Sequence, residues 1–379
     1  MIIRIALIFI VFINISFAKT KIFDKEIAYY ETPIITNKDL PKGWVVASDP
    51  ELVKFGNRWW MFFNSINLDF KKGLKIHVLA ASLPKGQPLS TNRKKWTVHS
   101  QPVISPGKEG SWDDHTIETT KYVFGYDQTA KQWVKRLYYV GWPKQDGSKK
   151  EYQISFVQWN KKKNQWIKHG TPVITATEKW EKLNGSSFIG DQSAYYDVKN
   201  KLWHIWYQAV SKPKDGGISL VHVTSIDGVN WKNKKRMHHR VPFATPLIKT
   251  GPFSMNVFVK NGQYYFSGFL YNQHDLSKQG LWVTRSSTPD GSKSGDFTVW
   301  HPLIFENNGI KWHDSGLVSS KCHATGLFAP TLHEENGKVW MFYHGYYRTG
   351  KVKDPCTNHS KNSGIIARAL IKDFYKIWK

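Results

Sequence analysis

The feature that most constrains the fold is an internal repeat of about 70 residues, which occurs five times along the chain. Each copy begins with an acidic or small residue, continues as a short apolar run, turns, and returns as an aromatic-rich run. The copies begin at Asp49, Glu118, Asp191, Ser254 and Ala329. β-Branched and aromatic residues bounded by Gly, Asn and Asp turns predict strands, and no stretch has the pattern of a long amphipathic helix. The chain is therefore expected to be all-β.

Each strand pair is followed by a third apolar run and then by a fourth run that carries a tryptophan. In the first copy the third run is Leu74 to Ser82, and the fourth run is Trp96 to Ile104. Five repeats of four strands predict a five-bladed β-propeller with four-stranded blades. Because no linker rich in Pro, Gly and Ser interrupts the rhythm, residues 19–379 are expected to form a single domain.

The N-terminal stretch Ile27 to Ile35 resembles the fourth run of the other copies, since it has the same Thr-Pro-aliphatic ending. No equivalent run follows the fifth copy except Asp373 to Lys379. We therefore predict that the N-terminal strand completes the last blade and pairs an edge that would otherwise be open.

Residues 1–18 have the pattern of a signal peptide. Arg4 provides the positive start, Ile5 to Phe17 provides the apolar run, and Ser16 and Ala18 are small residues suited to a cleavage site. The apolar run is short for a membrane span, although an uncleaved anchor is the alternative. The mature protein is expected to be secreted or periplasmic, without stable membrane insertion, and monomeric.

The formal net charge is +25, carried mostly by lysine. Such a charge favours acidic polymers, but the lysines fall in turn-like places such as Lys161 to Lys163, which is typical of a solvated surface. No nucleic-acid-binding motif is present, so nucleic acid is not expected as a partner. The two cysteines, Cys322 and Cys356, either pair in an oxidising compartment or remain free thiols.

Three of the repeat copies begin with a carboxylate: Asp49, Glu118 and Asp191. The first strand of each propeller blade lines the central channel, so these residues are expected at the same depth around one pocket. Neighbouring carboxylates raise one another's pKa, and a protonated acid beside an ionised base is what glycoside hydrolysis requires. The alternative is that each carboxylate only caps a turn.

Three segments carry a resemblance to a known family. Ser48 to Val53, followed by a turn and Trp59 to Phe63, resembles the first-blade motif of glycoside hydrolase family 43 and is similar to the fructosidase-type family 32. Trp112 to Thr119 resembles the entry to the second blade of these enzymes, and Ser225 to Trp231 resembles their S-x-D-G-x-x-W turn. The resemblance implies a five-bladed propeller that hydrolyses glycosidic bonds in an oligo- or polysaccharide.

The resemblance also implies roles for the three acids. Asp49 matches the general base of family 43 or the nucleophile of family 32, Asp191 the third-blade acid, and Glu118 the second-blade carboxylate that tunes pKa values. Those families usually present Asp, Asp, Glu, whereas this chain presents Asp, Glu, Asp. Either Asp191 is a short acid, or Glu118 donates the proton, or Asp114 works in place of Glu118. A non-catalytic glycan-binding or adhesion propeller is the alternative function.

The expected ligand is a carbohydrate, and the positive charge favours an anionic glycan. The candidate substrate contacts are Trp112, Asp114, His115, Asn256 and His323. Trp112 is the favoured platform for stacking a sugar ring, with Trp142 and Trp180 as further loop aromatics. No spacing of His and Cys predicts zinc, and no cofactor is expected to be required. The resemblance implies that His323 helps to hold a structural calcium ion or a water cluster in the central channel, and a purely structural histidine is the alternative.

Overall fold

A computed structural model describes residues 21–67, 75–143, 151–215, 217–237, 253–270, 276–306, 308, 310, 327–348 and 362–379. The statements below concern these residues. The predicted signal peptide, His323 and both cysteines lie outside them.

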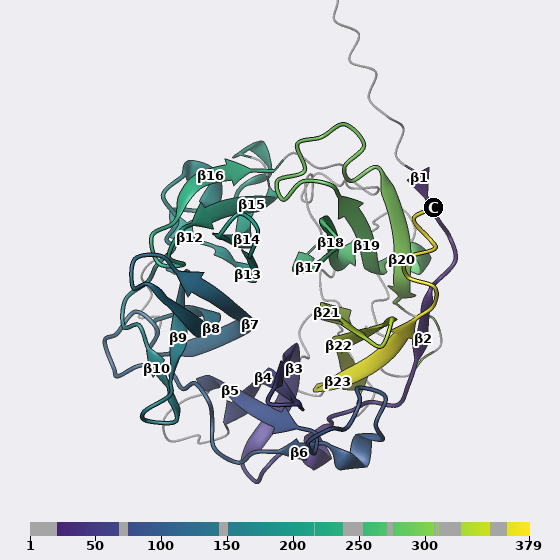
Figure 1. Cartoon of the computed structure of the whole chain (residues 1–379), viewed down its shortest axis with the longest axis horizontal. Helices are drawn as coiled ribbons and strands as arrows, with labels where there is room; N and C mark the ends of the chain where they lie inside the picture. The colour runs from purple at the N-terminus through teal and green to yellow at the C-terminus, as the bar shows by residue number, and fades with distance from the viewer. Residues whose placement is uncertain are drawn as a thin grey trace, which may run out of the picture.

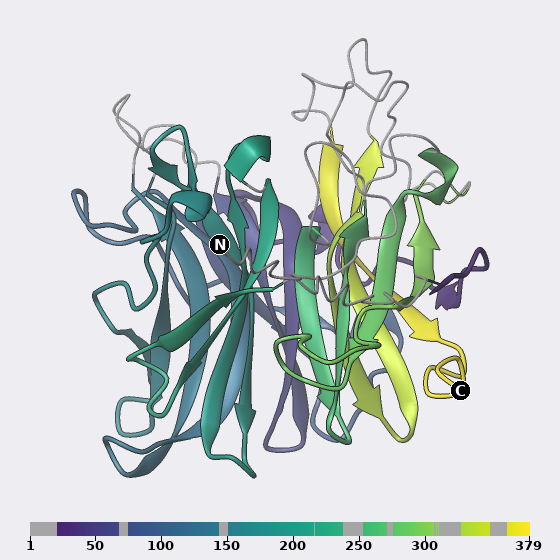
Figure 2. The ribbon, with the colours of Figure 1, turned by 90° about the horizontal axis from the view of Figure 1, so that it is seen from above.

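The described strands follow one another around a central axis as five groups, each with antiparallel pairing inside it (Figure 1). The first two groups are joined into one sheet by a parallel contact, with Ile76 opposite Thr116. In each group the first strand lies nearest the axis, and Figure 2 shows the strands running from one face of the molecule to the other. In order, the groups are β3 (Trp44–Phe55), β4 (Arg58–Asn67), β5 (Lys75–Ser82) and β6 (Thr97–Val98); β7 (Thr116–Asp127), β8 (Gln132–Trp142), β9 (Gln153–Asn160) and β10 (Gln165–Lys168); β13 (Ile189–Asp197), β14 (Leu202–Val210), β15 (Ile218–Ser225) and β16 (Lys232–Arg236); β17 (Phe253–Lys260), β18 (Gln263–Leu270), β19 (Gly280–Ser286) and β20 (Val299–Phe305); and β21 (Leu327–Glu335), β22 (Lys338–Arg348) and β23 (Asn362–Ile371), with β2 (Ala28–Tyr30) beside β23.

The all-β prediction is confirmed. A small ribbon of β11 (Lys182–Leu183) and β12 (Ser186–Ser187) lies outside the groups. The helical segments of the described chain are short 3-10 turns: Asn37–Asp39, Arg93–Lys95, Lys179–Glu181, Pro213–Asp215 and Leu276–Lys278. Within the described ranges, none of them has the length and apolarity needed to span a bilayer.

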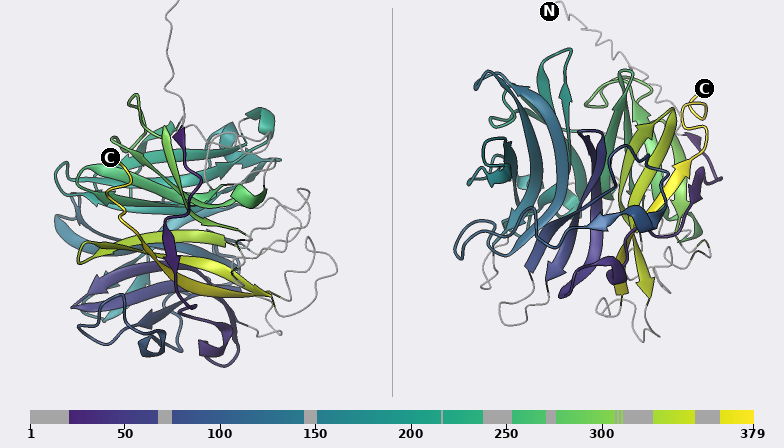
Figure 3. Two further views of the ribbon diagram at one scale, coloured as in Figure 1. Left: turned by 90° about the vertical axis from the view of Figure 1, so that its right-hand side faces the viewer. Right: turned by 60° about the horizontal axis from the view of Figure 1, so that its bottom comes forward.

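The N-terminal segment runs along the rim of the last two groups. β1 (Lys21–Ile22) pairs in parallel with β20, and β2 pairs antiparallel with β23, with Ala28 opposite Ile371. Figure 3 shows this purple segment crossing the outer side of the green and yellow strands. The paired strand is shorter than the predicted run from Ile27 to Ile35.

Hydrophobic clusters fill the space between consecutive groups because each strand sends alternate side chains to opposite faces. On β4, Phe62 packs toward the second group, whereas Met61 and Phe63 pack toward the fifth. On β14, Trp206 packs toward the fourth group, while Ile205 and Tyr207 pack toward the second. Both faces of these strands are thus buried, which explains their nearly continuous apolar sequence.

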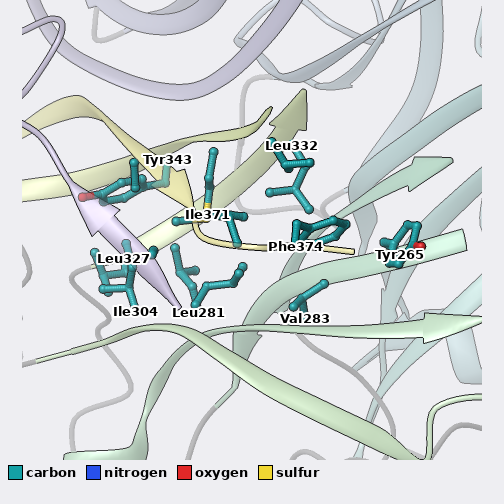
Figure 4. Packing of buried hydrophobic residues seen from close by; sticks show 14 of the residues in the cluster. Tyr265, Leu281, Val283, Ile304, Leu327, Leu332, Tyr343, Ile371 and Phe374 are labelled. Atoms are coloured by element: carbon teal, nitrogen blue, oxygen red, sulfur yellow. The ribbon is translucent and has the colours of Figure 1, made fainter. Parts of the chain in front are cut away.

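The largest of these clusters lies between the fourth and fifth groups (Figure 4). Leu281 and Ile304 of the fourth group meet Leu327 and Tyr343 of the fifth. The chain end also belongs to this cluster, since Phe374 is buried within it. A further cluster joins the fifth group to the first, so each group packs on two neighbours.

Candidate active site

In each group the pairing register between the innermost strand and the second strand is interrupted at an equivalent position. The interruption is a β-bulge, which changes the direction of the side chains beside it. A non-glycine residue with positive φ marks each bulge: Asp49, Thr119, Asp191, Ser254 and Ala329, with φ between 43° and 53°. This left-handed backbone is uncommon for such residues, and outliers of this kind cluster at functional sites. The five bulges therefore define one layer around the axis.

The bulges correct the alignment of the three acids. Asp49 and Asp191 occupy the same position in their repeats, namely the bulge of the innermost strand. In the second group this bulge position is occupied by Thr119. Glu118 precedes the bulge and pairs with Val140 across β8. The prediction that all three acids occupy the same repeat position is thus wrong by one residue for Glu118.

The three acids nevertheless line one cavity of about 390 Å³ at the axis. Asn64, Ser254 and His344 also line this cavity. The acids are half-buried, so they contact the cavity while protein surrounds most of each side chain. The structure brings together the three carboxylates that sequence analysis singled out.

Two influences of opposite sign act on Asp49. Burial raises the pKa of its carboxyl group, while the positive charge of Lys121 and a hydrogen bond from Asn64 lower it. The Asn64 side-chain amide donates this bond to Asp49 Oδ2 over 2.6 Å. Burial is the larger influence, so the pKa of Asp49 is raised overall. The donated hydrogen bond and the nearby cation limit this rise and favour the ionised form that a general base requires.

At Glu118 the neighbouring charges act in the same direction as burial. Burial raises its pKa to about 8, with further increases from the charges of Asp49 and Asp191. Burial and Asp49 also raise the pKa of Asp191, to about 7, although Lys121 and the Thr119 hydroxyl oppose the shift. At neutral pH, Glu118 is therefore the carboxyl group that most favours the protonated form.

A buried ion pair lies on the axis beyond the acids. Lys121 and Glu51 are both buried, and Lys121 Nζ lies 3.2 Å from Glu51 Oε2. Each residue is two positions after a bulge, at Thr119 and Asp49 respectively, so the pair lies one pleat further along the channel. Glu51 also accepts a hydrogen bond from the Tyr122 backbone N–H over 3.1 Å.

Aromatic side chains form a wall beside Glu118 and Asp191. Tyr152 stacks on Trp142 with ring centroids 4.5 Å apart and on Phe188 at 4.9 Å. An adjoining cavity of about 380 Å³ is lined by Tyr152 and Phe188 together with these two acids. The carboxylates thus lie between two cavities that each combine polar and apolar lining residues, an arrangement suited to a ligand with hydroxyl edges and apolar faces.

The predicted residues before the second group are placed outside the acid cavity. Asp114 accepts a hydrogen bond from the Gly110 backbone N–H over 2.7 Å and thereby holds its own loop. The Trp112 ring stacks on Tyr139 at 5.7 Å and its indole donates to the Gly170 carbonyl. These contacts assign structural roles to Asp114 and Trp112.

Two further predicted residues have different positions relative to the acids. His115 packs edge-on against Trp142 with centroids 5.8 Å apart, and so borders the aromatic wall. Asn256 is buried two residues after Ser254 and lines a separate cavity with Glu51 and Lys121. The structure therefore does not bring Asn256 into the acid cavity, and His323 lies outside the described residues.

The expected structural calcium stays a prediction, because His323, its implied ligand, lies outside the described residues. No cluster of three or more His, Cys, Asp or Glu side chains within the described ranges has a geometry for a metal. The buried Lys121 also places a positive charge in the channel, which disfavours a second cation beside it.

Sequence analysis missed Asn64, Gln208 and His344, which occupy equivalent places on the second strands of their groups. Each pairs with the residue just before the bulge of the neighbouring strand. Burial lowers the pKa of His344 to about 3, so its imidazole is neutral at the cavity wall. The signal was present in the sequence, because each of these residues ends an apolar aromatic run with one polar side chain.

The structure has the fold of known glycoside hydrolases. A glycoside hydrolase matches over 93% of this chain and 92% of its own, with 13% identity and a TM-score of 0.57. A thermostable family-43 glycoside hydrolase matches over 88% and 92%, with 12% identity and a TM-score of 0.52. The all-β fold expected from the resemblance to family 43 is thereby confirmed.

The same fold also occurs in a phosphorylase. The β-1,2-mannobiose phosphorylase from Listeria innocua, in complex with β-1,2-mannobiose, matches over 92% of this chain and 98% of its own, with 10% identity and a TM-score of 0.59. No protein-family model and no curated protein sequence matches the chain significantly. The comparisons therefore show the fold, and the chemistry must be argued from the cavity.

Proposed function

We propose that the protein is a glycoside hydrolase that cleaves an oligo- or polysaccharide with Asp49 as general base and Glu118 as general acid. The observation that carries the proposal is one cavity holding two carboxyl groups with different neighbours. A cation and a hydrogen-bond donor oppose the rise in the pKa of Asp49, whereas neighbouring anions add to the rise in the pKa of Glu118, to about 8. Such a pair supplies the two proton transfers of glycoside hydrolysis.

The proposal includes the wider expectations from the sequence. The protein is an exported, monomeric, five-bladed propeller in one domain, and β2 closes its last blade. Export is supported by the pattern of residues 1–18, and closure is supported by the pairing of β2 with β23. Asp191, whose pKa is raised to about 7, adds negative charge beside Glu118 and helps to keep it protonated.

Hydrolysis is favoured over phosphorolysis by the composition of the cavity wall. Among the described residues, those that line the acid cavity include no lysine or arginine to hold a phosphate dianion. Water is therefore the expected nucleophile, activated by Asp49. Adding inorganic phosphate should leave the rate and the products unchanged.

A polysaccharide panel tests the proposal. Wild-type protein should release reducing ends from at least one neutral or acidic polysaccharide, and an Asp49→Asn/Glu118→Gln double variant should release none. Folding of the double variant is checked by circular dichroism and thermal unfolding. Binding without hydrolysis by the wild-type protein would favour a glycan-binding propeller and would refute the proposed catalysis.

Removal of the buried cation should shift the pH dependence. Lys121 lowers the pKa of Asp49 and of Asp191, so Lys121→Met should raise both. The base must be ionised, and therefore the acidic limb of kcat/KM should move to higher pH, by about one unit. The pH profile of hydrolysis measures this shift.

Two controls separate charge from structure in this experiment. Lys121→Arg keeps the charge and should leave the acidic limb near its original position. A Glu51→Gln/Lys121→Met double variant leaves no unpaired buried charge and should show the same upward shift as Lys121→Met. An unmoved limb in both methionine variants would contradict an electrostatic role for Lys121.

A further inference from the structure

Another cavity, of about 450 Å³, lies between the first and second strand groups. Its aromatic lining consists of Phe55, Trp60, Phe62, Trp159 and Trp166. None of these residues lines the acid cavity. Phe55 is six residues after Asp49 along β3, which corresponds to about 20 Å at the usual rise of a strand. The cavity is therefore separate from the candidate active site, and its Phe55 end is the part furthest from Asp49.

The tryptophans of this cavity are more exposed than the two tryptophans at the centre of the neighbouring interfaces. Trp203 and Trp206, which lie in neighbouring interfaces, have an exposed fraction of 0%. Trp60, Trp159 and Trp166 are only half-buried. Indole surface thus lines an open cavity, and exposed aromatic surface of this kind commonly marks a ligand site.

The tryptophan rings are held at fixed angles. Trp159 and Trp166 meet edge to face, with centroids 5.3 Å apart and planes at 67°. Trp166 is perpendicular to the buried Phe62 at 6.1 Å, and Trp60 stacks on His99 at 5.1 Å. Rigid indole faces pack against the apolar C–H faces of pyranose rings with little loss of conformational entropy.

The rim of the cavity is cationic. The turn that joins Trp159 to Trp166 contains Lys161, Lys162 and Lys163, all of them exposed. Lys135 also lines the cavity, with its ammonium 5.0 Å from the Phe55 ring centroid. None of these four described lysines forms an ion pair within the protein. Their charge is thus available to an anionic ligand.

We propose that this cavity, which we name the tryptophan pocket, is a non-catalytic binding site for an acidic polysaccharide. Sugar rings stack on the indoles, and the carboxylate or sulfate groups of the chain pair with Lys135 and the turn lysines. Asn164, which also lines the cavity, supplies an amide for the sugar hydroxyl groups. The site retains the polymer at a distance from the acids and requires no catalysis.

Calorimetric titration with polygalacturonate oligosaccharides tests the proposal. The full chain carries Asp49→Asn and Glu118→Gln, so that no probe is hydrolysed. Adding Trp166→Ala, or the triple change Lys161→Gln/Lys162→Gln/Lys163→Gln, should weaken binding at the tryptophan pocket at least 10-fold. If the acid cavity also binds the probe, one of two binding events should be lost. Neutral galactan of equal length should bind at least 10-fold more weakly than polygalacturonate.

Matched controls distinguish the pocket from general charge and from misfolding. Lys131→Gln/Lys199→Gln/Lys201→Gln makes the same charge change on other exposed turns and should leave binding unchanged. The triple variant at residues 161–163 alters only exposed side chains, so its thermal unfolding should match that of the parent. Dextran sulfate serves as a second probe: tighter binding than polygalacturonate would identify sulfate as the preferred anion.

Three outcomes would overturn the proposal. These are full-strength binding in both pocket variants, equal binding of neutral galactan, and concentration-dependent dimerisation that Trp166→Ala abolishes. The last would make a second copy of the chain the occupant. The inference is separable from the proposed hydrolysis, since a chain that hydrolyses nothing can still show lysine- and tryptophan-dependent binding.

Discussion

Asp49→Asn should lower kcat by about 10³-fold and change KM little, because general acid–base catalysis contributes in this range. Asparagine has nearly the shape of aspartate but cannot accept a proton. The side chain of Asn64, 2.6 Å from Asp49 Oδ2, can still donate to the substituted amide oxygen. The loss should therefore reflect chemistry rather than a displaced side chain. Steady-state kinetics on whichever polysaccharide the panel identifies measures it.

The stability of the Asp49→Asn variant provides an internal check. The carboxyl group is buried near Glu118 and Asp191, so its neutral replacement removes repulsion that the folded chain otherwise contains. The midpoint of thermal unfolding should stay constant or rise. The matched control Asp24→Asn changes an exposed residue paired with Lys278 and should retain full activity. Full activity in the Asp49 variant would refute its role as base.

The strands could be predicted from the sequence because the alternation of side chains that defines a strand is visible within a few consecutive residues. Alternation along β4 sends Phe62 to one neighbouring group and Met61 to the other, and such a pattern is visible in a short window. The position of Glu118 could not be predicted in the same way. A bulge inserts one residue, and a shift of one residue exchanges the faces of a strand. Only the partner strand shows that Thr119, not Glu118, occupies the bulge.

The lysines show a second limit of sequence reasoning. Most of the charge was expected on a solvated surface, but Lys121 is buried against Glu51, a residue from the preceding strand group. The sequence alone does not distinguish a lysine in a surface turn from a lysine in the channel. Whether a lysine is buried depends on an ion-pair partner that is distant in sequence. Trp112 shows the converse, because a loop tryptophan expected at a sugar-binding rim stacks instead on Tyr139.

Glu118→Gln should affect natural and activated substrates differently. A general acid protonates the leaving group, so kcat/KM on a polysaccharide should fall by about 10²- to 10⁴-fold. An aryl glycoside whose phenol is a good leaving group needs little protonation and should lose far less activity. Side-by-side kinetics on the two substrate types tests this difference. A similar loss on both would contradict the role of Glu118 as the proton donor.

The pH profile then separates Glu118 from Asp191. The acid must be protonated, and the pKa of Glu118 is raised to about 8, so wild-type activity should decline as the pH rises through this value. Glu118→Gln cannot titrate and should lose this alkaline limb on the activated substrate. If Asp191, with a pKa raised to about 7, were the donor, Asp191→Asn would show both the leaving-group dependence and the lost limb.

If Asp191 instead supplies charge, Asp191→Asn should lower the pKa of Glu118, because one of its anionic neighbours is removed. The alkaline limb should then move to lower pH while remaining present.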